Sequence, residues 1–195
     1  MKMLRNQHGF NLIELMFAVL IMAITVNYAT PAVQTFMEKN HLKQAAERIY
    51  HFYRYARSEA IKQNKVLYVR YFGDGSSAWS FGLSADSNCV PTDTSTDPSP
   101  CLITVSDIQV QKTIINGSTG VDYNNISMSL ENPSGTAVND MEIMLDPVRG
   151  SSTAGGIVLA TSNGWKLRNR ISPLGEIQIC VPAGAPPLVG YRACS

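Results

Sequence analysis

The feature that most constrains this sequence is an apolar segment close to its start. It runs from Phe10 to about Tyr28, which is roughly the ~20 residues that a helix needs to cross a bilayer. The nine residues before it are polar and include the basic residues Lys2 and Arg5, and the next basic residue is Lys39. Because positive charge lies only on the N-terminal side, we expect residues 1–9 to stay in the cytoplasm and the rest of the chain to lie outside.

A carboxylate inside this segment needs an explanation. A secretory signal would be shorter and would end in a small-residue cleavage site, which the sequence lacks. A plain membrane anchor leaves Glu14 unexplained, because a charge at the centre of a spanning helix costs about 2.5 to 3.5 kcal/mol and is functional by default. If the chain is cut after Gly9, the new α-amino group of Phe10 could pair with Glu14 of a neighbouring subunit and set the register of an assembly.

The segment from Gly9 to Leu15, GFNLIEL, resembles the class III signal of type IV prepilins and type II secretion pseudopilins. The resemblance implies that prepilin peptidase cuts between Gly9 and Phe10 and methylates the new amine, and that Glu14 is the assembly glutamate. Pro31 resembles the proline that kinks the helix in many relatives. Before assembly, the resemblance implies that the chain is anchored in the inner membrane with its globular domain in the periplasm. It then implies assembly with other pilins and minor pilins into a pilus at the cell surface.

An amphipathic pattern follows Pro31 and predicts that the helix continues. Apolar residues recur at steps of three and four, at Leu42, Ala45, Ala46, Ile49, Phe52, Tyr53, Ala56, Ala60 and Ile61. We expect one helix from about Phe10 to Asn64, kinked at Pro31, with residues 10–30 in the membrane or filament core and residues 31–64 amphipathic. His41 and His51 have no Asp or Cys at ligand spacing, so we predict no metal site there.

Residues 65–195 have the pattern of a β-rich globular domain. Short alternating or apolar runs are separated by Gly, Asn, Pro and Asp, and the expected strands are Val66–Phe72, Ala78–Leu83, Leu102–Ile115, Ile126–Leu130, Met141–Leu145, Ile157–Thr161, Trp165–Ile171 and Glu176–Val181. We expect Ser84–Pro100 to form a surface loop. The predicted fold class is α+β, a long N-terminal helix packed on an antiparallel β-sheet domain.

The four cysteines favour disulfides over metal binding. Cys89, Cys101, Cys180 and Cys194 include no C-x-x-C pair and have no histidine close by. Four cysteines allow three pairings, but Cys89 with Cys101 and Cys180 with Cys194 each close a short loop rich in Pro or Gly. The alternative is four buried free thiols. Disulfides indicate an oxidising compartment, in agreement with export.

Two further segments narrow the resemblance. Tyr55–Ile61, YARSEAI, and the Ser172–Gly175 turn, SPLG, resemble the GspH/FimT/FimU subgroup of minor pilins and pseudopilins, whose members help to initiate filaments at or near the tip. This implies a minor pilin that primes pilus assembly. The alternatives are a DNA-binding minor pilin or other tip receptor, and a minor pseudopilin of a type II secretion system.

Composition and motifs argue against catalysis. Loss of residues 1–9 would leave 14 basic and 15 acidic side chains, so no overall field attracts nucleic acid. The sequence has no nucleophile elbow, phosphate loop, dinucleotide fingerprint or zinc motif, and the only two histidines after the leader fall on the predicted helix. We therefore predict a protein that is not an enzyme and that needs no cofactor or metal.

One basic row gives a DNA hypothesis. Lys166, Arg168 and Arg170 share one face if they lie on a strand, at steps of about 6.5 to 7 Å that resemble phosphate spacing. A solvated outer face or a guarded sheet edge also explains such a row, and this is the reading we favour. DNA-uptake relatives carry a G-R-x-R motif, whereas Gly175–Gln178 here reads GEIQ. DNA is therefore a partner that we consider but do not favour.

Overall fold

The computed structural model of the chain describes residues 11–91, 99–105, 108–116, 123 and 125–194. These residues belong to two compact units, residues 1–38 and residues 39–195. Each unit is described by itself. The expected cleavage site, Gly9 and Phe10, lies outside the described residues.

A single helix, α1, begins in the first unit, and its residues from 39 onward belong to the second unit. It spans Leu12–Gln63 and contains Pro31. Its end is a Schellman motif, in which Asn64 takes a left-handed conformation with φ of 50° and the amides of Asn64 and Lys65 bond to the carbonyls of Ile61 and Ala60. The sequence placed the end of the helix at the same asparagine.

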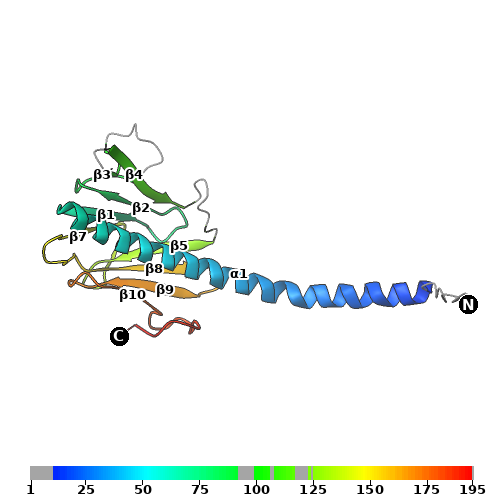
Figure 1. The fold of residues 1–195 in the computed structure, drawn as a ribbon. Helices are drawn as coiled ribbons and strands as arrows, with labels where there is room; N and C mark the ends of the chain where they lie inside the picture. The colour runs from blue at the N-terminus through cyan, green and yellow to red at the C-terminus, as the bar shows by residue number, and fades with distance from the viewer. Residues whose placement is uncertain (1–10, 92–98, 106–107, 117–122, 124, 195) are drawn as a thin grey trace, which may run out of the picture. The chain divides into compact units, whose positions relative to one another are not determined.

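The globular unit contains two antiparallel sheets (Figure 1). The first has the order β3-β4-β2-β1-β7, with β1 at Leu67–Phe72, β2 at Ser80–Ser84, β3 at Leu102–Val105, β4 at Ile108–Ile115 and β7 at Asp140–Leu145. The second has the order β10-β9-β8-β5-β6, with β5 at Ile126–Glu131, β6 at Ala137–Val138, β8 at Gly155–Thr161, β9 at Lys166–Ile171 and β10 at Ile177–Cys180. The α+β class is confirmed.

The strand boundaries require two corrections. Leu102–Ile115 was expected to be one strand, but it forms two antiparallel strands, β3 and β4, with Val105 opposite Ile108. The dipeptide between them, Ser106-Asp107, is of a type that favours turns, a signal that the apolar run concealed. The two-residue strand β6 was not expected, because a strand of that length has no recognisable period.

The core of the globular unit lies between α1 and the inner faces of both sheets. Residues 39–63 of α1 lie across the sheets in Figure 1. The residues of α1 that are buried to 1% exposure or less form a stripe at Leu42, Ala45, Ala46, Ile49, Tyr53, Ala56 and Ala60. Burial alternates along β1, β5 and β9, as expected for strands with one face in the core. This packing accounts for the stability of the unit, since each buried aliphatic side chain contributes about 1.5 to 3 kcal/mol.

Residues 73–79 join β1 to β2 within the first sheet and also hydrogen-bond to β5 of the second sheet. The buried indole of Trp79 donates a hydrogen bond of 2.9 Å to the carbonyl of Ile126 on β5. The Trp79 ring is stacked against Phe81 and Tyr123, at centroid distances of 6.1 and 5.8 Å. Because the indole N–H is paired, the large ring is buried without leaving an unsatisfied donor.

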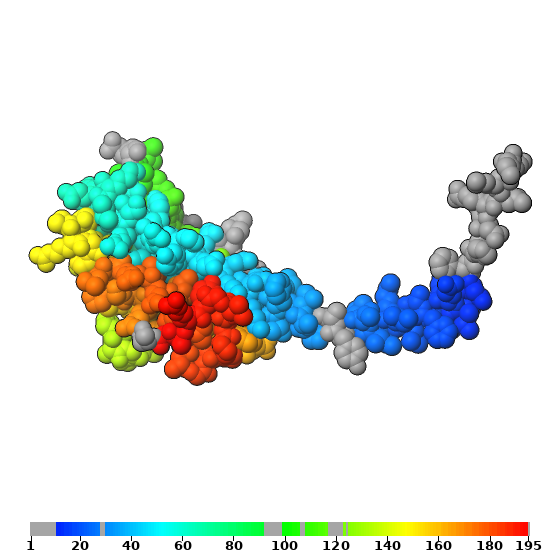
Figure 2. Space-filling view, turned by 60° about the horizontal axis from the view of Figure 1, so that its bottom comes forward, coloured from blue at the N-terminus to red at the C-terminus, as the bar shows by residue number. Residues whose placement is uncertain are grey.

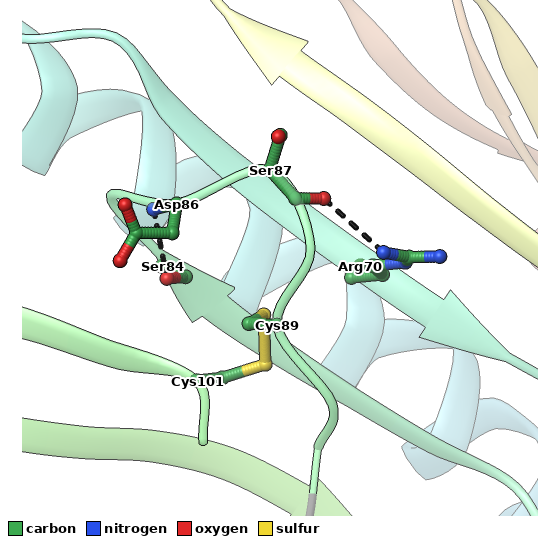
Figure 3. Close-up of a disulfide and its surroundings, with 6 residues drawn as sticks. All are labelled: Arg70, Ser84, Asp86, Ser87, Cys89 and Cys101. Atoms are coloured by element: carbon green, nitrogen blue, oxygen red, sulfur yellow. Dashed lines mark hydrogen bonds between the residues drawn. A yellow bond between two sulfur atoms is a disulfide. The ribbon is translucent and has the colours of Figure 1, made fainter. Parts of the chain in front are cut away.

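Two disulfides close loops at the margins of the globular unit. Cys89 is bonded to Cys101, and Cys180 to Cys194. The first lies against β2 (Figure 3), where a Cβ on Gly82 would meet the Cys101 sulfur at 2.8 Å. Arg70 also holds this loop, because its guanidinium donates a hydrogen bond of 3.2 Å to the carbonyl of Ser87.

The pairing can be tested by peptide mapping without reduction. We expect one linked peptide pair that contains Cys89 and Cys101 and another that contains Cys180 and Cys194. Replacing both members of either pair by Ser should lower the free energy of unfolding by about 3 kcal/mol. Each bridge closes a short loop, of 12 or 14 residues in sequence separation, and its loss returns conformational entropy to the unfolded chain. Crossed peptides, or four alkylated free thiols in exported protein, would contradict the pairing.

Candidate functional site

The first unit presents apolar surface on every side. From Leu12 to Met37, each large apolar side chain of α1 that the structure describes is more than half exposed. The helix is long and apolar enough to cross a membrane. A helix that is apolar all round requires lipid or other helices around it, so this segment is a binding surface along its whole length.

Glu14 is the exception in this surface. It lies in the first turn of α1, and residues 12–37 contain no other charged side chain. Polar side chains further along return hydrogen bonds to their own helix: Thr25 to Ile21 at 3.1 Å, and Asn27 to Ala23 at 2.8 Å. Among the described residues Glu14 has no such partner, so its carboxylate is available to a group from outside the chain.

A second cluster fixes the helix where it enters the globular unit. Lys39, Lys43 and Glu47 are four residues apart and share one face of α1. The ammonium of Lys39 lies 3.9 Å above the ring centroid of Trp165, and that of Lys43 lies 5.9 Å from the ring of Tyr191. Tyr191 donates a hydrogen bond of 2.9 Å to Glu47. Burial, with a smaller contribution from Glu47, raises the pKa of Tyr191 to about 12, so its hydroxyl remains a donor at neutral pH.

The C-terminal tail supplies Tyr191 and is itself held in place. The amide of Val181 bonds to the carbonyl of Arg192 at 2.8 Å, and that of Cys194 bonds to Val181 at 2.9 Å. Leu188 is buried, and the Cys180–Cys194 disulfide closes the segment. Figure 2 shows the tail, in red, beside the cyan part of the helix. Sequence reasoning missed this cluster, although the four-residue spacing on the helix was a signal.

The two segments that carry the subgroup resemblance meet in the fold. Arg57 of the YARSEAI segment donates a hydrogen bond of 2.7 Å to the carbonyl of Gly175 in the SPLG turn. Gly175 has a φ of 72° and packs so closely on Gly150 that a Cβ would collide with the Gly150 carbonyl. Ser152 bonds to the carbonyl of Ser172 at 3.0 Å. Arg57 thus ties α1 to two adjacent turns, which gives these segments a structural role.

The basic row on β9 has the expected alternation, but Arg168 in the middle of the row is paired. Lys166 and Arg170 are exposed, whereas Arg168 is half-buried. Arg168 pairs with Glu131 at 2.6 Å, and it reaches β5 by crossing β8 over Gly156, where a Cβ would lie 2.8 Å from its Nε. This ion pair favours a structural role for Arg168. Among the described residues, no group of three or more His, Cys, Asp or Glu side chains could hold a metal ion.

The contribution of Arg57 can be measured by denaturation of the full chain in detergent. We expect Arg57→Ala to lower the free energy of unfolding by about 1 to 3 kcal/mol, because it removes a charged donor from a half-buried carbonyl. Arg54→Ala is the matched control, since the exposed Arg54 contacts the hydroxyl and the ring of Tyr50 on the same helix. Equal free energies of unfolding for the two variants would show that the Arg57 contact does not stabilise the fold.

The basic row can be tested with duplex DNA at low and moderate salt. We expect the full chain not to bind, because Arg168 is paired and two exposed cations neutralise few phosphates. Salt-sensitive binding that disappears in a Lys166→Ala/Arg168→Ala/Arg170→Ala variant would contradict this expectation and support a DNA receptor.

Comparison with known proteins places the chain. The family model of type II transport protein GspH matches residues 45–175, a range that includes both Arg57 and Gly175. The crystal structure of the type IV minor pilin FimU of Pseudomonas aeruginosa, strain PAO1, is similar at 16% identity and a TM-score of 0.44, over 74% of this chain and 91% of that one. No curated protein matches the chain.

The family match covers more than half of the chain and includes most of the globular unit. Proteins of this kind are structural subunits without enzymatic activity that assemble with other pilins. The N-terminal apolar helix fits a membrane anchor for the globular domain. The chain therefore belongs to the GspH family, and it is a minor pilin or pseudopilin of a type IV pilus or a type II secretion system.

Proposed function

We propose that the chain is a minor pilin that primes the assembly of a type IV pilus and is located at or near its tip. Its leader, residues 1–9, is removed by prepilin peptidase between Gly9 and Phe10, and the new amine is methylated. Before assembly, the helix spans the inner membrane and the globular domain lies in the periplasm. The protein then enters the pilus at the cell surface.

The observation that carries this proposal is the carboxylate of Glu14 on an otherwise apolar helix surface, which has no partner among the residues that the structure describes. A free carboxylate is unfavourable in lipid and in a bundle of apolar helices unless an opposite charge neutralises it. The α-amino group at Phe10 of a neighbouring mature subunit would provide that charge. The pair can form only when the two helices are in register, so it converts an unfavourable group into a selector for correct docking.

The priming role and the tip location rest on the subgroup resemblance. The resembling segments, Tyr55–Ile61 and Ser172–Gly175, fall within or at the edge of the matched range 45–175. They also meet in the fold through Arg57 and Gly175. The two short motifs that carry the likeness are therefore also in contact in this chain.

A minor pseudopilin of a type II secretion system is the second candidate. The description of the matching family, type II transport protein GspH, favours it directly. The same cleavage, helix and glutamate would serve both systems, so the chemistry of the chain does not separate them. Deletion separates them: loss of surface pili indicates the first system, and loss of secreted enzymes with intact pili indicates the second.

Processing can be tested by N-terminal sequencing of the mature protein. We expect the mature chain to begin at Phe10 with a methylated amine, because the polar leader ends at Gly9. A Gly9→Leu variant should remain uncleaved, since the bulky side chain obstructs the scissile bond. A mature chain that begins elsewhere would disprove this assignment.

The role of Glu14 can be tested by quantifying the protein in sheared filaments. We expect Glu14→Ala to reduce incorporation at least about tenfold, because it removes one partner of a buried charge pair, while membrane insertion persists. Glu176→Ala is the matched control, since Glu176 is exposed on the globular unit. Normal entry of the Glu14→Ala variant into filaments would disprove the proposed role of Glu14.

A further inference from the structure

A groove lies between α1 and β4 on the globular unit, and the roles described above do not involve it. It has a volume of about 620 Å³. Arg48, His51, Phe52 and Tyr55 line one side and come from α1, and residues 111–114 of β4 line the other. The helical residues are spaced by three and four, so they form one stripe beside the buried stripe.

The floor of the groove is apolar and continuous with the core. Phe52 is half-buried and packs edge-to-face on the buried ring of Phe81, at a centroid distance of 4.8 Å. Ile114 on β4 also packs against the core. Since these side chains are held from below, the floor is a fixed surface that can receive an apolar side chain from outside without rearrangement.

The rim of the groove is positively charged. Arg48 and Lys112 lie on its two sides, and the Lys112 ammonium is 5.9 Å from the centroid of the Tyr55 ring. Among the residues that the structure describes, no Asp or Glu lines the groove. The ion pairs that the structure shows among its described residues involve other cations: Lys62 with Glu59, Arg70 with Asp140, and Arg168 with Glu131. The two rim cations therefore have no carboxylate partner within the described chain.

This charge pattern selects the occupant. We propose that the groove binds another pilin subunit, through an apolar side chain that enters it and a neighbouring Asp or Glu that pairs with Arg48 or Lys112. The apolar floor matches the anchor of a protein interface, and the rim matches a carboxylate at its edge. Nucleic acid fits less well, because two cations neutralise too few phosphates for stable binding. The inference rests on the proposed function, in which the chain assembles with other pilins.

The contact can be tested in cells that make the full chain. Tyr55→benzoylphenylalanine places a photoreactive group in the groove, and mass spectrometry identifies the cross-linked peptide. We expect a peptide from another pilin-type subunit in which an Asp or Glu lies next to an apolar residue. In the same background, Arg48→Glu/Lys112→Glu should reduce the cross-linked product about tenfold or more, because it replaces attraction by repulsion.

A matched control separates a local effect from an effect of net charge. Lys65→Glu/Lys166→Glu makes the same change of charge at two exposed sites outside the groove, and it should leave the cross-linked product unchanged. Replacing the partner carboxylate by Lys should restore cross-linking to the Arg48→Glu/Lys112→Glu variant. Arg48→Gln/Lys112→Gln provides a milder change that should also weaken the contact if charge reversal reduces the amount of folded protein.

Failure of the inference differs from failure of the proposed function. If the unmodified chain enters filaments and depends on Glu14, but the Arg48→Glu/Lys112→Glu variant cross-links as the control does, the groove proposal is wrong alone. A nuclease-sensitive cross-link, or one to a protein that is not a pilin, also overturns it. If the unmodified chain never enters an assembly with other pilins, the proposed function fails as well.

Discussion

The buried stripe of α1 is the interaction on which the globular unit depends. The stripe residues between Leu42 and Ala60 are enclosed by the inner faces of two separate sheets. In the part of the chain that the structure describes, neither sheet has another helix to cover it. A sheet with an uncovered apolar face is not stable in water. The helix therefore serves as the common wall of the core, and its small residues, Ala45, Ala46 and Ala56, let both sheets approach it closely.

The sequence predicted the features that depend on local periodicity. The buried stripe, the helix end at Asn64 and the alternation along β9 repeat every few residues, so a short window contains the signal. Division into two sheets could not be predicted in this way. It is determined by which strands pair, and β5 pairs with β8 about thirty residues away, a choice that the periodicity of neither strand encodes.

The contacts around the helix could not be predicted from the sequence either, because they join residues that are far apart in the chain. Arg57 reaches Gly175 across 118 residues of sequence, and Glu47 reaches Tyr191 across 144. The pairing of Arg168 with Glu131 requires the absence of a side chain at Gly156, on the strand between them. Each contact joins residues whose individual patterns are ordinary, so only the fold shows that they meet.

These contacts have a mechanical consequence for a subunit that is held by its helix. Within the globular unit, the helix is fixed near its entry by Lys39 on Trp165 and by Glu47 with Tyr191, and further along by Arg57 on Gly175. The buried stripe runs along the same part of the helix and resists sliding, because any shift would expose apolar surface. A force applied to the helix is thus transmitted to both sheets together.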